Sequence, residues 1–339
     1  MILRQVLTTA IATLIFEAAH GTIPASCQDG TCEEIHNTYK RFTLPKEHDS
    51  IEKYLNPKIF QDPETVQSIQ QRLRDGHLVV IKNAFLEDYA EAMYDELNTS
   101  SDFELQESYD FEDGFHYSHH NIYDLSKYKN LMNTTLSMFN SEATKALCQE
   151  WSGRDCSGTS IASSSYYAPG DHSLPHTDHL GQRSVAYVWH LTKNWKPQWG
   201  GALYWCREYA DSTYIHASFN TLTLFAVTPF TTHFVTTVSP HATEKRLAFN
   251  GWWESSWIPS AEDPLETLLD INSSEEEFRK EALQLTFYQY TRLENIAEQC
   301  EKDSNFVSPP ERCDALIELY DEIDHLFFPE EVMTEIIDV

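Results

Sequence analysis

The sequence has few basic residues and few glycines for its length. Of 339 residues, 24 are Lys or Arg and 53 are Asp or Glu, which gives a formal net charge of -29 at pH 7. A surface this acidic repels phosphate backbones, so nucleic acid is excluded as an expected partner. Because there are only 11 glycines and no repeat of fixed period, collagen-like and solenoid architectures are excluded as well.

Long hydrophobic runs are also missing after the N-terminus. Beyond residue 21 no segment approaches the roughly 18 apolar residues that cross a bilayer, so we expect no membrane span. Residues 1–21 combine Arg4, an apolar run over 6–16 and small residues near Ala19, which is the layout of a secretory signal peptide. The alternative is an unprocessed amphipathic helix. We therefore expect the protein in the secretory pathway, in the endoplasmic reticulum lumen or secreted.

The cysteines and the glycosylation sequons fit that compartment. Six of the seven cysteines are near neighbours in sequence, and they predict the disulfides Cys27–Cys32, Cys148–Cys156 and Cys300–Cys313, with Cys206 left free. Buried free thiols are the alternative. Sequons begin at Asn98, Asn133 and Asn272, which favours a glycoprotein.

Composition and pattern divide the chain into four parts. Hydrophobic residues make up 41% and aromatic residues 13% of the chain, enough for a sizeable core. We expect a signal peptide (1–21), an N-terminal extension (22–62), a catalytic domain (63–258) and an acidic helical C-terminal extension (259–339). Residues 261–339 contain 22 acidic and five basic residues. Apolar positions at helical spacing there predict helices that dock one face on the core, and the charge indicates solvated faces or a surface for a basic partner.

The catalytic domain has a mainly β pattern. Helices are expected over 63–73 and 86–97, with a short strand at 77–81 between them. Short candidate strands then follow in quick succession, at 160–167, 184–191, 202–206, 214–219, 221–227, 233–238 and 246–253. Many short strands separated by turn residues predict a sandwich or a barrel.

One constellation of residues carries the chemistry. His176 and Asp178 are two residues apart, so a strand would point both side chains to the same side. His233 follows 57 residues after His176, and Arg246 opens a strand 13 residues later. Two histidines and a carboxylate on one face form the facial triad of non-haem Fe(II) oxygenases, which leaves open positions for a co-substrate and O2. A buried arginine would bind a carboxylate of that co-substrate with its two-pronged guanidinium.

Three stretches, over 174–187, 199–204 and 218–252, resemble the Fe(II)/2-oxoglutarate-dependent dioxygenases of the prolyl hydroxylase superfamily. The resemblance covers about 75–255 and is nearest to the branch of prolyl 3-hydroxylases and prolyl 4-hydroxylase-like enzymes. It implies an α+β fold with a mainly β core, a double-stranded β-helix (jelly roll) with flanking helices.

The resemblance also implies roles for single residues. His176, Asp178 and His233 would ligate Fe(II), and Arg246 would bind the C5 carboxylate of 2-oxoglutarate, with Lys245 as its rival for that role. His190 stands where that branch has a tyrosine that helps to bind 2-oxoglutarate. Tyr167 matches another aromatic residue near the pocket.

By the same resemblance, the expected reaction is hydroxylation of a protein side chain, most readily prolyl, with release of succinate and CO2. Fe(II), 2-oxoglutarate and O2 would be required, and ascorbate is a candidate reductant. The substrate would be a protein or peptide, basic or proline-containing. Three alternatives stay open: a small-molecule 2-oxoglutarate oxygenase, a catalytically inactive jelly-roll binding module, and a cupin-type metalloenzyme that needs no Arg246.

Other histidines lie near the motif, and they are interpreted as loop or structural residues: His172, His179, His216 and His241. The cluster His116, His119 and His120 is interpreted as a polar loop, with a substrate groove as the alternative.

Overall fold

The computed structural model describes residues 42–110, 115–206, 214–228, 231–256, 287–306, 311–327 and 336–339. The chain divides into two compact units, 1–43 and 44–339, and the description below concerns the second. The predicted signal peptide, the Cys27–Cys32 pair and the sequon at Asn272 lie outside the described residues.

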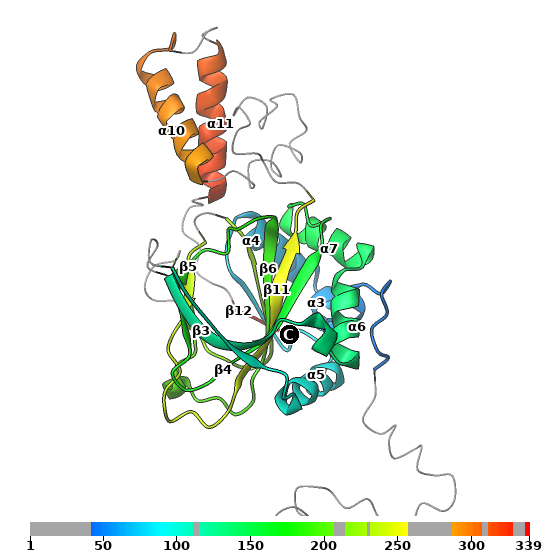
Figure 1. Cartoon of the computed structure of the whole chain (residues 1–339). Helices are drawn as coiled ribbons and strands as arrows, with labels where there is room; N and C mark the ends of the chain where they lie inside the picture. The colour runs from blue at the N-terminus through cyan, green and yellow to red at the C-terminus, as the bar shows by residue number, and fades with distance from the viewer. Residues whose placement is uncertain are drawn as a thin grey trace, which may run out of the picture. The chain divides into compact units, whose positions relative to one another are not determined.

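Eight antiparallel strands form the centre of the domain, and they follow the order of a jelly roll (Figure 1). One sheet has the order β9-β6-β11-β4 and the other the order β5-β10-β7-β8. The strands are β4 (Ser160–Tyr167), β5 (His172–His176), β6 (Arg183–Leu191), β7 (Leu203–Trp205), β8 (Tyr214–Ile215), β9 (Phe219–Ala226), β10 (His233–Val235) and β11 (Arg246–Glu254). Successive strands alternate between the two sheets, except that β7 and β8 lie in the same one. This is the double-stranded β-helix that the family resemblance implied.

Four further strands extend these sheets. The hairpin of β2 (Glu104–Asp110) and β3 (Phe115–Ile122) joins the two sheets, since β3 pairs with both β4 and β5. On the other side β1 (Val79–Lys82) pairs with β9, and β12 (Ile336–Asp338) adds in parallel to β1. The expectation of a helical extension over 259–339 did not contain this last strand, whose pairing partner lies more than 250 residues earlier.

Helices cover one face of the β9-β6-β11-β4 sheet (Figure 1). They are η1 (Ile51–Lys53), α3 (Lys58–Gln61), α4 (Pro63–Arg74), α5 (Glu87–Thr99), η2 (Leu125–Lys127), α6 (Asn130–Phe139) and α7 (Glu142–Ser152), while η3 (Pro197–Trp199) precedes β7. Local signals set their ends: the Asp62 side chain accepts from the Glu64 amide, Pro63 begins α4, and Gly153 ends α7 at a positive φ.

The compact unit begins before residue 63. Ile51, Tyr54 and Leu55 are buried, and the Ile51 amide donates to Thr144 Oγ1 of α7 at 2.8 Å. Part of the predicted N-terminal extension therefore packs with the catalytic domain.

The core of the barrel lies between its two sheets. Side chains from both sheets meet there, with Leu78, Val80, Ala186, Leu203, Trp205, Ile215, Phe225 and Val227 in one buried cluster. This packing holds the short strands of the smaller sheet in place, and β5 and β10 of that sheet carry the candidate ligands.

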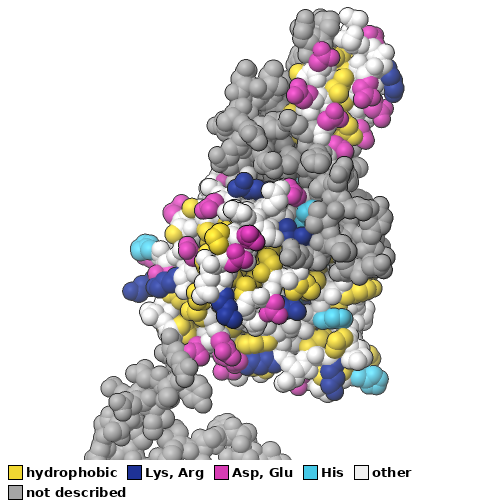
Figure 2. All heavy atoms as spheres, turned by 180° about the vertical axis from the view of Figure 1, so that it is seen from behind, with side chains coloured by type: hydrophobic (Ala, Val, Ile, Leu, Met, Phe, Trp, Pro, Cys, Tyr) yellow, Lys and Arg dark blue, Asp and Glu magenta, His cyan; other side chains and the backbone are white. Residues whose placement is uncertain are grey.

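The acidic C-terminal extension contains the helices α10 (Phe287–Lys302) and α11 (Glu311–Phe327), which pack on each other. Their apolar stripes meet through Leu293, Ala297, Leu319 and Ile323, and the predicted Cys300–Cys313 disulfide joins them. Figure 2 shows acidic side chains over much of the visible face of these helices. Docking of an apolar face on the barrel stays a prediction.

The predicted Cys148–Cys156 disulfide is wrong: both cysteines are free and buried. Cys148 packs on the inner side of α7, and Cys156 lies beyond Gly153, which ends that helix. Burial raises the pKa of both thiols, to about 12 for Cys156, so they pack as small apolar groups. Cys206 is free, as expected, but exposed.

Among the described helices, none is long and apolar enough to cross a membrane. Asn98 and Asn133 of the sequons are both exposed.

Candidate functional site

The smaller sheet brings His176, Asp178 and His233 together. His176 ends β5 and His233 opens the neighbouring strand β10, directly opposite His176 in the antiparallel register. Asp178 follows two residues after His176, and its two carboxylate oxygens lie 3.7 Å from His176 Nε2 and 3.6 Å from His233 Nε2. One ligand atom from each residue lies within 4.8 Å of the others. In the described part of the chain no other group of three His, Cys, Asp or Glu side chains meets this geometry.

Backbone carbonyls orient both imidazoles. His176 Nδ1 lies 2.7 Å from the carbonyl oxygen of Leu174, and His233 Nδ1 lies 3.1 Å from that of Thr231. Since a carbonyl only accepts, the assigned tautomer carries the hydrogen on Nδ1 and leaves the Nε2 lone pair facing Asp178. Burial and the neighbouring His233 lower the pKa of His176, which favours the neutral form that binds metal.

Aromatic rings hold the two imidazoles in place. Phe225 and Trp205 pack on His233 with ring centroids 4.9 and 6.0 Å away, and Phe115 of β3 lies 4.9 Å from His176. These contacts leave the ligand side of each ring facing the carboxylate. Two neutral imidazoles and one carboxylate are a donor set that fits Fe(II), with three coordination positions left for other ligands.

Arg183 is a contact of this site that sequence reasoning missed. Its guanidinium lies over the Trp252 ring at 3.6 Å, and Nη1 is 3.9 Å from Asp178 Oδ1. The arginine belongs to the stretch that carries the family resemblance, but only the fold shows that it returns to Asp178. Its positive charge helps to orient the carboxylate.

Arg246 is a buried cation of the barrel. It opens β11 opposite Tyr167 of β4, and only 3% of its surface is exposed. Its Nε donates to the carbonyl of Gly201 at 2.5 Å, and its Cζ is 4.6 Å from the Tyr167 ring centroid. Among the described residues no carboxylate lies within 4.0 Å of this guanidinium. A buried arginine without a counter-charge favours an anionic ligand.

Lys245, the rival for that role, points elsewhere. Its Nζ donates to the carbonyl of Asn98 at 3.1 Å, and it lies over the rings of Phe103 and Tyr166 at the surface. The geometry therefore favours Arg246 as the residue that meets an anion in the pocket.

His190 of β6 is completely buried near Arg246. Within the described residues neither of its ring nitrogens has a hydrogen-bond partner. Burial, followed by the charge of Arg246, lowers the pKa of His190 to about 3, so the ring is neutral at pH 7. Tyr187, three residues before His190, donates to the carbonyl of Ile161 on the helix-covered side.

The remaining histidines separate into surface and strand positions. His216 and His241 are exposed. His116 and His172 contact each other at 2.9 Å, His120 contacts Asp171 at 3.0 Å, and the sequence cluster His116, His119 and His120 is part of strand β3, not a loop.

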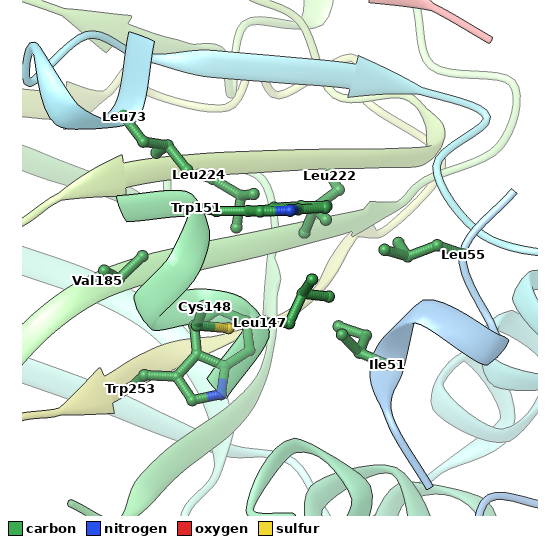
Figure 3. Close-up of a pocket in the computed structure, with 10 residues that line it drawn as sticks. All are labelled: Ile51, Leu55, Leu73, Leu147, Cys148, Trp151, Val185, Leu222, Leu224 and Trp253. Atoms are coloured by element: carbon green, nitrogen blue, oxygen red, sulfur yellow. The ribbon is translucent and has the colours of Figure 1, made fainter. Parts of the chain in front are cut away.

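A separate cavity lies on the helix-covered face of the sheet, and Figure 3 shows its lining. Ten residues line it: Ile51, Leu55, Leu73, Leu147, Cys148, Trp151, Val185, Leu222, Leu224 and Trp253. Leu222 and Leu224 point to one face of β9 and Phe225 points to the other, where it contacts His233. The cavity and the ligand cluster therefore lie on opposite faces of the sheet. The cavity offers no polar group for catalysis.

The chain was compared with known proteins. Residues 162–254 match the family model described as the 2OG-Fe(II) oxygenase superfamily, and no curated protein sequence matches the chain. Among solved structures, a Pseudomonas putida prolyl-4-hydroxylase is 15% identical with a TM-score of 0.45, covering 56% of this chain and 98% of its own.

A Trichoplax adhaerens prolyl hydroxylase, solved with a hypoxia inducible factor peptide fragment, is 14% identical with a TM-score of 0.45, covering 58% of this chain and 92% of its own. The epimerase SnoN of nogalamycin biosynthesis is 10% identical with a TM-score of 0.40, covering 57% and 82%. All six candidate residues fall inside the segment that matches the 2OG-Fe(II) oxygenase superfamily model.

Proposed function

We propose that this protein is an Fe(II)- and 2-oxoglutarate-dependent oxygenase whose iron is held by His176, Asp178 and His233. The observation that carries the proposal is the convergence of these three ligand atoms within 4.8 Å, with both imidazoles oriented by backbone carbonyls. When bound, iron with 2-oxoglutarate and O2 would supply oxidation of the co-substrate to succinate and CO2, coupled to insertion of one oxygen atom into a C–H bond.

The residues of this chain would position the co-substrate and keep water away from it. Arg246 would bind the far carboxylate of 2-oxoglutarate, with His190 and Tyr167 beside it in the same pocket. Because Arg246 and His190 are buried, their hydrogen bonds would act in a medium of low dielectric constant, where they are stronger than in water. His190 stands where the family has a tyrosine, and it still offers a hydrogen-bond donor, since a neutral imidazole has one N–H.

We propose that the substrate is a side chain of a protein or peptide, and that a prolyl side chain is the leading candidate. The resemblance of 174–187 and 218–252 to prolyl hydroxylases supports this choice. Aromatic side chains near the ligand cluster, Phe115 against His176 and Tyr117 against Phe115, offer surfaces on which a pyrrolidine ring can pack. The acidic helices α10 and α11 would favour a basic partner.

The signal peptide that the sequence predicts over 1–21 would place the enzyme in the endoplasmic reticulum lumen or outside the cell, where ascorbate could keep the iron reduced. A metabolite substrate is the second candidate, because the same triad and pocket would serve it equally well.

The test of the proposed function needs no substrate. Residues 22–339 are mixed anaerobically with Fe(II) and 2-oxoglutarate, and the visible metal-to-ligand charge-transfer band is recorded. We expect the band in the wild type and its loss in His233→Ala. A folded wild type that binds Fe(II) and 2-oxoglutarate but gives no band, or binds neither, would overturn the assignment.

The substrate class is tested next. Succinate release in the presence of proline-containing basic peptides is compared with release in the presence of a metabolite panel, and products are examined for a gain of one oxygen atom. Oxygen gained by a peptide supports the prolyl proposal. Oxygen gained only by a metabolite would replace it with the second candidate.

A further inference from the structure

Strand β3 presents one histidine to the candidate pocket and turns the next one away. Phe115, Tyr117 and His119 alternate along one face of β3, and Phe115 contacts the ligand His176. On that face His119 stacks on Tyr167, with ring centroids 4.8 Å apart and planes inclined by 8°. On the opposite face His120 stacks on Tyr166 at 4.4 Å and 11°.

The two histidines differ in their hydrogen bonds. His120 Nδ1 contacts the carboxylate of Asp171 at 3.0 Å. The Nδ1 atom of His119 is buried and has no hydrogen-bond partner among the described residues. A buried polar atom without a partner costs free energy, so a group that meets it when a ligand binds is favoured.

The surroundings of His119 indicate the nature of that ligand. Tyr167, on which His119 stacks, also contacts the Arg246 guanidinium at 4.6 Å. Burial, followed by the charge of Arg246, lowers the pKa of His119 to about 4. The ring is therefore neutral at pH 7, with one N–H to donate. Tyr167 connects it to Arg246, a buried cation that has no carboxylate partner in the described chain.

We propose that His119 is a binding residue of the co-substrate pocket: it donates a ring N–H to the carboxylate that Arg246 binds, and it holds Tyr167 in place by stacking. This inference rests on the proposed function. It would make the site selective for a 2-oxo dicarboxylate over a 2-oxo monocarboxylate, because His119 and Arg246 would both meet the far carboxylate, which a monocarboxylate lacks.

The histidines on the other face of β3 show that this arrangement is specific to His119. His116 lies between Glu107 at 3.1 Å and His172 at 2.9 Å, and His172 Nδ1 contacts the carbonyl of Gly170 at 3.1 Å. Each of these rings already has protein partners, so the outer face needs no ligand to satisfy it.

The experiment measures co-substrate affinity without turnover. Anaerobic Fe(II)-loaded wild type, His119→Phe and His120→Phe are titrated with 2-oxoglutarate and with 2-oxobutyrate, which keeps the chelating end and lacks the far carboxylate. Phenylalanine preserves a stacked ring and removes the nitrogens. The charge-transfer band reports binding, and the Fe(II) affinity of each protein is measured separately.

We expect His119→Phe to weaken 2-oxoglutarate binding roughly 10- to 150-fold, the usual range for one lost hydrogen bond to a charged group. Its affinities for 2-oxobutyrate and Fe(II) should not change, and His120→Phe should match the wild type throughout. Unchanged 2-oxoglutarate affinity in His119→Phe, or an equal loss for both oxo acids, would overturn the inference.

If His119→Phe does not fold, His119→Leu removes the same nitrogens and is judged by the same criteria. Failure of this inference is distinguishable from failure of the proposed function, because the wild type would still give the band in the first case and would lack it in the second.

Discussion

His233 lies directly opposite His176 in the antiparallel pair of β10 and β5, although 57 residues separate them in the chain. Their ring centroids are 4.5 Å apart, and both Nε2 atoms face the carboxylate of Asp178. The register of two short strands thus determines the candidate metal centre.

Removal of one imidazole should abolish tight iron binding. We expect His233→Ala to lower Fe(II) affinity by more than the 10- to 100-fold that is typical for loss of an outer-shell partner, because a direct ligand disappears. Equilibrium dialysis with Fe(II) measures the change. His216→Ala, at an exposed position, is the control and should bind Fe(II) as the wild type does. Equal affinity in both variants would contradict the assigned ligands.

Replacement of the buried arginine should affect the co-substrate and spare the metal. We expect Arg246→Ala to weaken 2-oxoglutarate binding by roughly 100-fold, since a buried charged hydrogen-bonded pair contributes several kcal/mol. Fe(II) affinity should stay at the wild-type value. The neighbouring Lys245, which is half-buried at the surface, offers the matched control, and Lys245→Ala should bind both Fe(II) and 2-oxoglutarate as the wild type does. The reverse pattern would favour Lys245 as the carboxylate partner.

The buried His190 predicts a dependence of stability on pH. Its pKa is lowered from 6.5 to about 3 in the folded protein, so between these values the unfolded chain binds more protons. The free energy of unfolding should therefore fall as the pH drops through that window, by about 2 kcal/mol from this residue between pH 8 and pH 5. Chemical denaturation of the metal-free protein at both pH values measures it.

The comparison protein for that measurement is His190→Gln, which does not titrate. Its loss of unfolding free energy between pH 8 and pH 5 should be smaller than that of the wild type by the same ~2 kcal/mol. Identical losses in the two proteins would show that His190 is not buried as a neutral ring.

The cysteines should separate into three classes on alkylation. We expect Cys206 to react in the native protein, because it is exposed, and Cys148 and Cys156 to react only after denaturation without reductant. Cys300 and Cys313 should react only after reduction, since a disulfide joins them. Peptide mass spectrometry after each step assigns the sites, and recovery of a Cys148–Cys156 disulfide would contradict the structure.

Local pattern in the sequence predicted much of the fold. The strand over 160–167 has the predicted bounds, and the expected helix over 63–73 is α4 (Pro63–Arg74). Alternation along a strand and apolar spacing along a helix depend only on neighbouring residues, so they can be seen without tertiary contacts. The proximity of His176 and Asp178 belongs to the same class, since these residues are close neighbours in the chain. Short separation alone did not decide the disulfides, because Cys300 and Cys313 are bonded while Cys148 and Cys156, which lie nearer in sequence, are not.

The contacts between segments that are distant in the chain were decided by the tertiary structure. It placed His119 on Tyr167, Arg183 near Asp178 and β12 beside β1, and it left Cys148 and Cys156 unbonded. None of these follows from periodicity, because each depends on strand register and on the direction in which a side chain leaves its element. The sequence alone determined the residue types and spacing of the candidate ligands, while the closing of the jelly roll decided which side chains share their pocket.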